Sequence, residues 1–331
     1  MSDLSRGSVT EKVSRRSQTS NPLTGKFGRS LTQQVRHADS SALVTVQEEV
    51  SSNIWIAPNG DASRAQAITS RKNLQEGVSG LGWTPDGKLI YSASINGNQN
   101  IWTMQVDGSE VKPLTDSPAD TFPAVSPDGR YLVFGSLRSQ KWQIWRTEID
   151  GNHPTQLTDS TGAITPAVSA DGQWVIYTPF GVGIWRVSID GGTPVKLSDK
   201  TPVTFPQASP NGKLLACFSI DDQTKRPQLT VMTLETGAMV KTFDLPVTVF
   251  GSEGLFPILH WSADSQGLIY TNTIGDISNL WRQPLDGGAA RQITDFKSDH
   301  IFNFAYSRDG RQLALARGNV SSDAVMISEV K

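Results

Sequence analysis

The sequence lacks several features that mark common protein classes. It has one cysteine, Cys217, within the apolar stretch LLACFSI, so no disulfide forms within the chain and the thiol is expected in the core. No apolar run approaches the roughly 18 residues that cross a bilayer, so we expect no membrane span. The formal net charge is −2. Without an excess of Lys and Arg, the chain does not fit a nucleic-acid binder.

Sequence signatures of common catalytic sites are also missing. The chain contains no GxSxG, HExxH, paired CxxC or GxxxxGK[ST] motif, no EF-hand loop and no protein-kinase signature. Its four histidines, which lie in different parts of the chain, have no metal-ligand spacing. We therefore expect a protein that is not an enzyme and that has no catalytic residue, metal or cofactor.

The N-terminal segment differs from the rest. Residues 1–36 carry seven basic and two acidic residues, and residues 1–20 are rich in Ser and Arg. We expect residues 1–20 to be a disordered tail and residues 21–331 to form a single domain. No apolar block of a secretory signal follows the basic residues. The chain as written is expected in the cytoplasm, and outside it if the N-terminus is truncated.

A short turn sequence of the SPDG type recurs at intervals of 40 to 53 residues. Proline presets the backbone for a type I turn, Asp suits the next position, and Gly allows the chain to leave without a Cβ clash. The flanking segments, such as YLVFGS and WVIYTP, are rich in β-branched and aromatic residues, which predicts antiparallel strands. The third residues of the seven copies are Asp39, Asp86, Asp128, Asp171, Asn211, Asp264 and Asp309.

Two further signatures follow most of these turns. An Ile-Trp or Leu-Trp pair appears 13 to 16 residues later within an alternating pattern, which predicts a third strand. An Asp-Gly hairpin then leads to a short fourth strand that ends in PLTD, QLTD, KLSD or QITD. The tryptophans are expected to fill the space between sheets, and the LTD aspartates to cap a turn.

Each unit is therefore predicted to be a four-stranded antiparallel sheet, and a period in the forties is typical of propeller blades. The fold class is all-β, a β-propeller with seven blades, or six as the alternative. The last unit ends after its third strand, near residues 324–330. Residues 21–25, NPLTG, resemble a fourth strand. We expect this N-terminal segment to supply the missing outer strand and close the ring.

With these motifs laid out, the chain resembles the TolB-like, WD40-like family of bacterial β-propeller repeats. The turns, the Ile-Trp strands and the LTD ends match in register, with departures at Asn211, at Ser265 and at Leu229-Thr230. The chain is also similar to the C-terminal propeller domains of bacterial serine/threonine kinases and winged-helix regulators. That resemblance implies a stand-alone or truncated sensor domain.

Candidate binding residues lie in the loops that vary between units. In a propeller, the loops between the second and third strands (B–C) and between units (D–A) share one rim, and we expect specificity there. Asp120, Lys297, Asp299 and His300 fall outside the repeated pattern and are the preferred candidates. The insertion at residues 247–256, VTVFGSEGLF, adds Phe250 and Phe256.

The leading functional hypothesis is a non-catalytic scaffold that binds a protein or peptide partner through this rim. Rigid display of the loops would limit the entropy lost on binding. The alternative is a propeller hydrolase or lactonase with an axial metal, which needs inward Asp, Glu, Asn or His residues. The first strands read FPAVSPDG, TPAVSADG and FPQASPNG instead. A third hypothesis, a purely structural remnant of a longer sensor, predicts neither partner nor metal.

Overall fold

The computed structural model describes residues 34–36, 42–71, 74–95, 97–180, 183–200, 203–250 and 257–328. The chain divides into two compact units, Glu49–Ser321 and the combination of Met1–Glu48 with Ser322–Lys331. In the second of these units, β1 (Gln34–Arg36) pairs antiparallel with the start of β2 (Ala42–Pro58). The predicted tail at residues 1–20 lies outside the described residues.

Four separate four-stranded antiparallel sheets form most of Glu49–Ser321. We call each a blade, and its strands A to D in chain order. The first two blades are β8 (Asp120–Val125), β9 (Tyr131–Ser136), β10 (Gln143–Glu148), β11 (Thr155–Gln156), and β12 (Ala167–Val168), β13 (Trp174–Tyr177), β14 (Ile184–Ser188), β15 (Val195–Ser198). The other two are β16 (Val203–Ala208), β17 (Leu214–Ile220), β18 (Pro227–Thr233), β19 (Met239–Asp244), and β20 (Leu259–Trp261), β21 (Gly267–Ile274), β22 (Ile277–Pro284), β23 (Arg291–Gln292).

The remaining strands join one nine-stranded sheet that includes segments from both ends of the chain. Its main path runs β24-β25-β2-β4-β5-β6-β7, and β1 and β3 pair with β2. Two short 3₁₀ helices, η1 (Ala62–Arg64) and η2 (Val247–Phe250), lie in connections. The new members of this sheet are β3 (Gln66–Ala67), β4 (Gln75–Trp83), β5 (Leu89–Ile95), β6 (Asn98–Met104), β7 (Lys112–Pro113), β24 (His300–Tyr306) and β25 (Gln312–Ser328).

The predicted count of seven blades, with six as the alternative, is therefore wrong, because the structure has four separate blades. The first and last sequence units do not form sheets of their own: β2 and β25 are continuous strands of 17 residues each, where the repeats predicted two strands and a loop. A single parallel pairing, Ser52 with Gln75, then joins β2 to β4. The all-β propeller class itself is confirmed.

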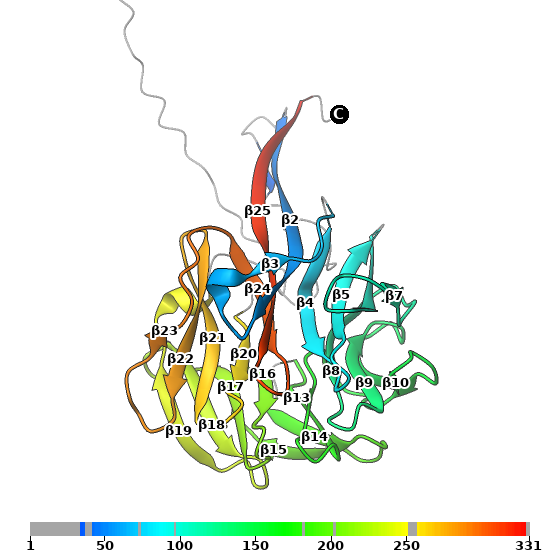
Figure 1. The fold of residues 1–331 in the computed structure, drawn as a ribbon, viewed down its shortest axis with the longest axis vertical. Helices are drawn as coiled ribbons and strands as arrows, with labels where there is room; N and C mark the ends of the chain where they lie inside the picture. Colours follow the sequence, from blue (N-terminus) through cyan, green and yellow to red (C-terminus); the bar gives the residue numbers. More distant parts are fainter. Residues whose placement is uncertain are drawn as a thin grey trace, which may run out of the picture. The chain divides into compact units, whose positions relative to one another are not determined.

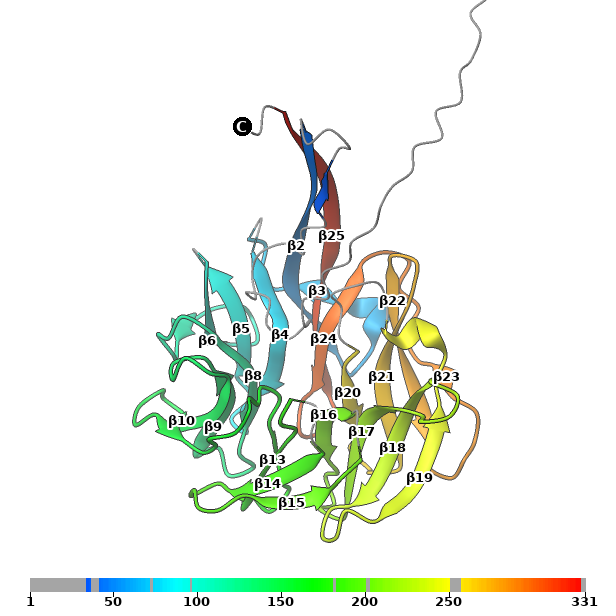
Figure 2. The ribbon, with the colours of Figure 1, turned by 180° about the vertical axis from the view of Figure 1, so that it is seen from behind.

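The A strands of Glu49–Ser321 contact one another in chain order, β8 with β12, β12 with β16 and β16 with β20. Figure 1 labels β8, β16 and β20 of this series. In both views β4 and β24 lie side by side, and they come from opposite ends of the chain (Figure 2). The indole Nε1 of Trp83 on β4 donates to the carbonyl of Ala305 on β24 at 3.0 Å. β2 and β25 are hydrogen-bonded neighbours in the same sheet. The predicted closing segment, residues 21–25, lies outside the described residues.

The two residues of each repeated Ile-Trp pair differ in burial. Ile54, Ile101 and Ile144 are fully buried, whereas the tryptophans beside them are only half-buried. The tryptophans were expected to fill the core, but at these three places the isoleucine before each tryptophan is the core residue. Cations lie over several of these Trp rings, with Arg138 at 5.0 Å from the Trp145 centroid and Lys196 at 5.6 Å from that of Trp185.

The threonine of each LTD segment has a structural role. The hydroxyl oxygen of Thr115 accepts from the backbone N–H of Ile101 at 3.0 Å, and Thr158 and Thr294 do the same for Ile144 and Leu280. Strands β7, β11 and β23 have only two residues each. The hydroxyl therefore extends a ladder that the short outer strand cannot complete, and satisfies a buried backbone donor.

His260 on β20 should make the stability of the fold depend on pH. Its ring meets Phe304 edge-on with centroids 4.8 Å apart, and burial lowers its pKa from 6.5 to about 4, partly offset by a hydrogen bond with the Phe304 backbone. Because the unfolded chain takes up this proton more readily, the free energy of unfolding should fall as pH drops from about 6.5 towards 4 and should not change above 6.5.

The His260→Phe variant keeps a ring against Phe304 and cannot be protonated. We expect chemical denaturation at a series of pH values to show up to about 3 kcal/mol less acid destabilisation than in the unmodified protein, at about 1.4 kcal/mol per pKa unit. His153→Phe, at a well-exposed histidine, is the control. Identical pH profiles for His260→Phe and the unmodified protein would contradict the assignment.

Candidate functional site

The predicted site residue Asp120 forms a buried clamp at the start of β8. Its side chain is 0 % exposed, and its Oδ2 accepts from Nη2 of Arg138 at 2.9 Å. Nε of Arg138 also donates to Oγ of Ser136 at 3.0 Å, and the guanidinium lies over the rings of Phe134 and Trp145. The ion pair thus fastens the D–A connection to the B–C loop of the same blade.

Asp299 makes a second clamp of the same kind. Nη2 of Arg317, on β25, donates to Oδ2 of Asp299 at 3.2 Å and to the carbonyl of Ser298 at 3.1 Å. The guanidinium lies 3.8 Å from the Phe296 centroid and 4.9 Å from that of Trp55. Burial lowers the pKa of Arg317 and Asp299 opposes that shift. Asp299 has φ +68°, a left-handed conformation that Asp tolerates, so this loop is tightly constrained.

His300 is buried directly after this clamp, with its ring centroid 5.9 Å from that of Phe302. Burial lowers its pKa, and the carboxylates of Asp276 and Asp299 act in the opposite direction. The backbone N–H of Ser278 donates to the carbonyl of Asp299 at 3.0 Å. The tip of the β21–β22 hairpin therefore lies against the D–A loop.

Exposed side chains lie on this hairpin and on two segments that contact it, and we call this set of residues the β21–β22 surface. It consists of Val247 on η2, Ile274 and Asp276 at the hairpin tip, and Lys297 in the D–A loop. Val247 and Ile274 are 73 % and 65 % exposed. Oγ1 of Thr248 donates to Oδ1 of Asn272 at 2.8 Å, which holds η2 against β21.

The structure brings some of the six predicted site residues together and separates others. Lys297 and Asp299 share one loop beside the hairpin, and His300 begins the strand β24 that follows it. Nζ of Lys297 pairs with Asp295 at 2.6 Å. Phe250 is the last residue of η2, which contacts β21. Asp120 belongs to the first separate blade and is not part of this surface. Phe256 lies outside the described residues.

The LTD aspartates have a role that sequence reasoning misjudged. The capping bonds come from the threonines, and Asp116, Asp159, Asp199 and Asp295 are exposed. Asp199 pairs with Lys196, and Asp295 pairs with Lys297. The prediction that these aspartates cap a turn is therefore wrong, and their carboxylates lie in solvent on the loop rim.

Two of the A strands bring aromatic rings together. Phe122 on β8 and Phe205 on β16 meet edge-on with centroids 5.6 Å apart, although the blade β12–β15 separates their strands along the chain. Both precede a proline and have positive φ, +50° and +53°, at the bulges of their strands. Among the described residues, no group of three or more His, Cys, Asp or Glu side chains is arranged to hold a metal.

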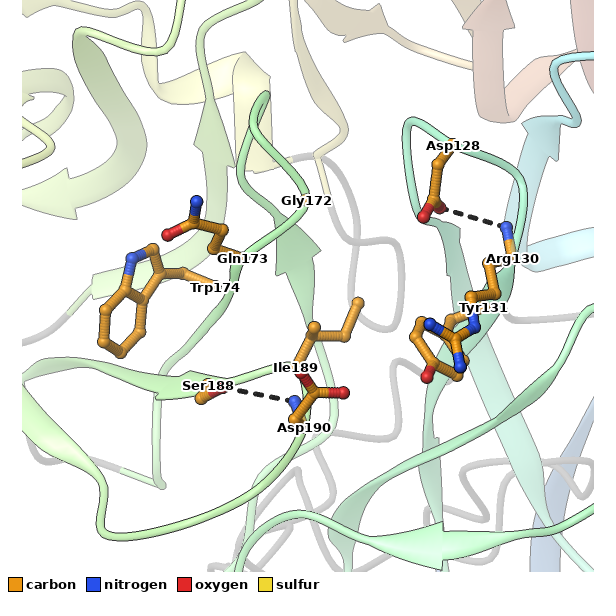
Figure 3. A pocket seen from close by; sticks show the side chains of 9 residues that line it. All are labelled: Asp128, Arg130, Tyr131, Gly172, Gln173, Trp174, Ser188, Ile189 and Asp190. Atoms are coloured by element: carbon orange, nitrogen blue, oxygen red, sulfur yellow. Dashed lines mark hydrogen bonds between the residues drawn. The ribbon is translucent and has the colours of Figure 1, made fainter.

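A separate cleft lies between two neighbouring blades, on the rim formed by the A–B and C–D turns (Figure 3). Its volume is about 340 Å³. Arg130 and Tyr131 form one wall, and Trp174 and Asp190 stand on the other. Nη1 of Arg146 pairs with Oδ1 of Asp190 at 3.2 Å and links the blades. Sequence reasoning missed this cleft because its residues belong to the regular turns, which it assigned to fold formation.

Four-stranded blades, ring-forming A strands and repeated turns define a β-propeller. A family model described as the TolB beta propeller domain matches residues 37–246, and the chain belongs to this family. No helix long and apolar enough to cross a membrane occurs in the part of the chain that the structure describes.

Solved structures show the same fold at low sequence identity. A protein of Agrobacterium tumefaciens described as a TolB is 17 % identical, with a TM-score of 0.61 over 80 % of this chain and 97 % of that chain. TolB from Acinetobacter baumannii is 17 % identical, with a TM-score of 0.58 over 91 % and 68 %. An uncharacterized protein of Agrobacterium fabrum is 46 % identical over 59 residues, which are 17 % of this chain and 20 % of that protein. This match therefore spans only about a fifth of the curated relative.

The Arg317 clamp predicts a measurable stability difference. Arg317→Ala leaves the Asp299 carboxylate without its partner and removes packing from Phe296 and Trp55, so we expect the free energy of unfolding to fall by roughly 2–4 kcal/mol. Arg317→Lys keeps the charge without the planar guanidinium and should lose less. Denaturant titration measures both. An Arg317→Ala protein within about 0.5 kcal/mol of the unmodified protein would show that the clamp contributes little.

Proposed function

We propose that the protein is a non-catalytic TolB-type propeller that binds a protein or peptide partner through its loop rim, at the β21–β22 surface. The observation that carries this proposal is the pair of exposed aliphatic side chains, Val247 and Ile274, on two segments that are hydrogen-bonded together. Exposed apolar groups bordered by charged residues are typical of protein interaction sites.

The neighbouring charges give the surface its specificity. Lys297 is well exposed and held by Asp295, and Asp276 lies at the hairpin tip. The Asp299–Arg317 clamp fixes the loop that carries Lys297. Because the loop and hairpin are already ordered, binding a partner costs little conformational entropy. Phe250 and Phe256, the two aromatic residues of the insertion at residues 247–256, stay predicted binding residues.

The alternative, an enzyme with an axial metal, has less support. Such a site requires several polar side chains turned towards the axis, whereas the A strands β8 and β16 bring the aromatic rings of Phe122 and Phe205 together. The Asp120 carboxylate binds Arg138, and Asp299 binds Arg317. The relation to sensor propellers of kinases and winged-helix regulators stays a prediction, as does the purely structural role.

Immobilised protein exposed to a bacterial lysate tests the proposal, with captured proteins quantified by mass spectrometry. The double variant Val247→Asp/Ile274→Asp should reduce capture of the specific partner at least tenfold, because it places charges in an apolar contact. The matched control, Val195→Asp/Met239→Asp, changes two exposed apolar residues on outer strands and should capture the partner normally.

Two results would contradict the proposal. One is equal capture by both double variants, which would move the interface elsewhere. The other is catalytic turnover by purified protein together with stoichiometric calcium or zinc, which would favour the enzyme. We expect these metals to leave the thermal unfolding temperature unchanged within error.

A further inference from the structure

The inter-blade cleft on the turn rim contains an unusual arrangement of charges. The guanidinium carbon of Arg130 lies 4.8 Å from the Tyr131 ring centroid, and that of Arg146 lies 4.3 Å from the same centroid. Two positive groups therefore share one aromatic ring. Tyr131 itself is buried, so the ring is a fixed platform for both.

The carboxylates of the cleft are already engaged. Oδ1 of Asp190 accepts from Arg146 at 3.2 Å. Oδ1 of Asp128 accepts from the Ser126 hydroxyl and, at 3.0 Å, from the backbone N–H of Arg130 (Figure 3). These two hydrogen bonds and, to a smaller extent, the charge of Arg130 lower the pKa of Asp128, so the group stays ionised within its turn. The Asp128 carboxylate is therefore hydrogen-bonded within its turn, and the Asp190 carboxylate is bound to Arg146.

Arg130 is the charged group of the cleft that lacks an ion-pair partner among the described residues. Its planar guanidinium is kept in place by stacking, and a planar guanidinium can bind a carboxylate through two parallel hydrogen bonds. Asp190 compensates the charge of Arg146, and the Asp128 carboxylate acts on Arg130 electrostatically. Among the described residues, however, the guanidinium of Arg130 donates no hydrogen bond, so its N–H groups can still bind a carboxylate. The N–H groups of Arg130 therefore favour a ligand that carries a hydrogen-bond acceptor such as a carboxylate.

We propose that this cleft is a second binding site, which takes an acidic side chain of an extended peptide or protein segment on Arg130. The remaining lining suits such a segment, because Gln173 and Ser188 offer polar groups and Trp174 offers an aromatic edge (Figure 3). Its volume of about 340 Å³ falls in the range of small ligand sites. The site lies on the turn rim and is independent of the β21–β22 surface on the loop rim.

The repeated turns offer a matched comparison. Arg311 follows the Asp309 turn just as Arg130 follows the Asp128 turn, but it is 80 % exposed and pairs weakly with Asp309 at 3.8 Å. No aromatic stacking of Arg311 is present among the described residues. The same residue type in the same turn position therefore lacks the platform and the cleft.

Fluorescence anisotropy with fluorescein-labelled hexaglutamate and the full chain tests the site. We expect the unmodified protein to bind hexaglutamate but not hexalysine, and Arg130→Ala to weaken binding at least tenfold. Arg130→Lys should weaken it several-fold, because the charge remains without the guanidinium plane. Arg311→Ala should bind within twofold of the unmodified protein. Asp190→Asn should strengthen binding, since it frees Arg146 for the peptide.

Thermal unfolding of every variant confirms that each is folded before binding is compared, and Arg130→Lys and Asp190→Asn keep the test informative if the alanine variant is unstable. The Val247→Asp/Ile274→Asp variant should bind hexaglutamate normally, which separates this site from the proposed partner surface. Failure of the unmodified protein to bind hexaglutamate would overturn the proposal. So would equal losses in Arg130→Ala and Arg311→Ala, because binding would then reflect general positive charge.

Discussion

Each sheet of this protein has two faces with apolar side chains, and a four-stranded sheet cannot bury both faces by itself. Fully buried strand residues such as Leu132, Phe134, Leu215 and Phe218 pack in clusters that combine their own sheet with a neighbouring one. An open row would leave its two terminal sheets with an uncovered face. The ring therefore depends on pairing between its ends, which β2 and β25 provide within one nine-stranded sheet.

The same packing requirement explains which residues remain for binding. Ile and Leu of the third strands occupy the core, LTD threonines complete the hydrogen-bond ladders, and two Asp–Arg clamps fix the rim loops. The groups that remain available for binding are exposed side chains on well-ordered strands and loops. The proposed contacts are the apolar side chains of Val247 and Ile274 on one rim and the charged Arg130, stacked on Tyr131, on the other.

The turn, Ile-Trp and LTD patterns were sufficient to predict an all-β propeller, because each encodes a local hydrogen-bond or packing preference. Asn211 shows how local that information is, since its side-chain oxygen accepts from Ser209 and Lys213 just as the turn aspartates do. The blade number was not predictable, because it depends on whether β2 and β25 each continue as one strand, which is decided by long-range pairing. For the same reason the Arg partners of Asp120 and Asp299, each 18 residues away, were not found from sequence.

Hydrogen–deuterium exchange at residues 49–58 and 312–321 tests the closed ring most directly. If pairing between β2 and β25 holds the ring together, these backbone amides should be protected as strongly as those of β9 and β17 and should open cooperatively with them. Exchange of both segments within seconds, while the four separate blades stay protected, would contradict a ring closed by these two strands.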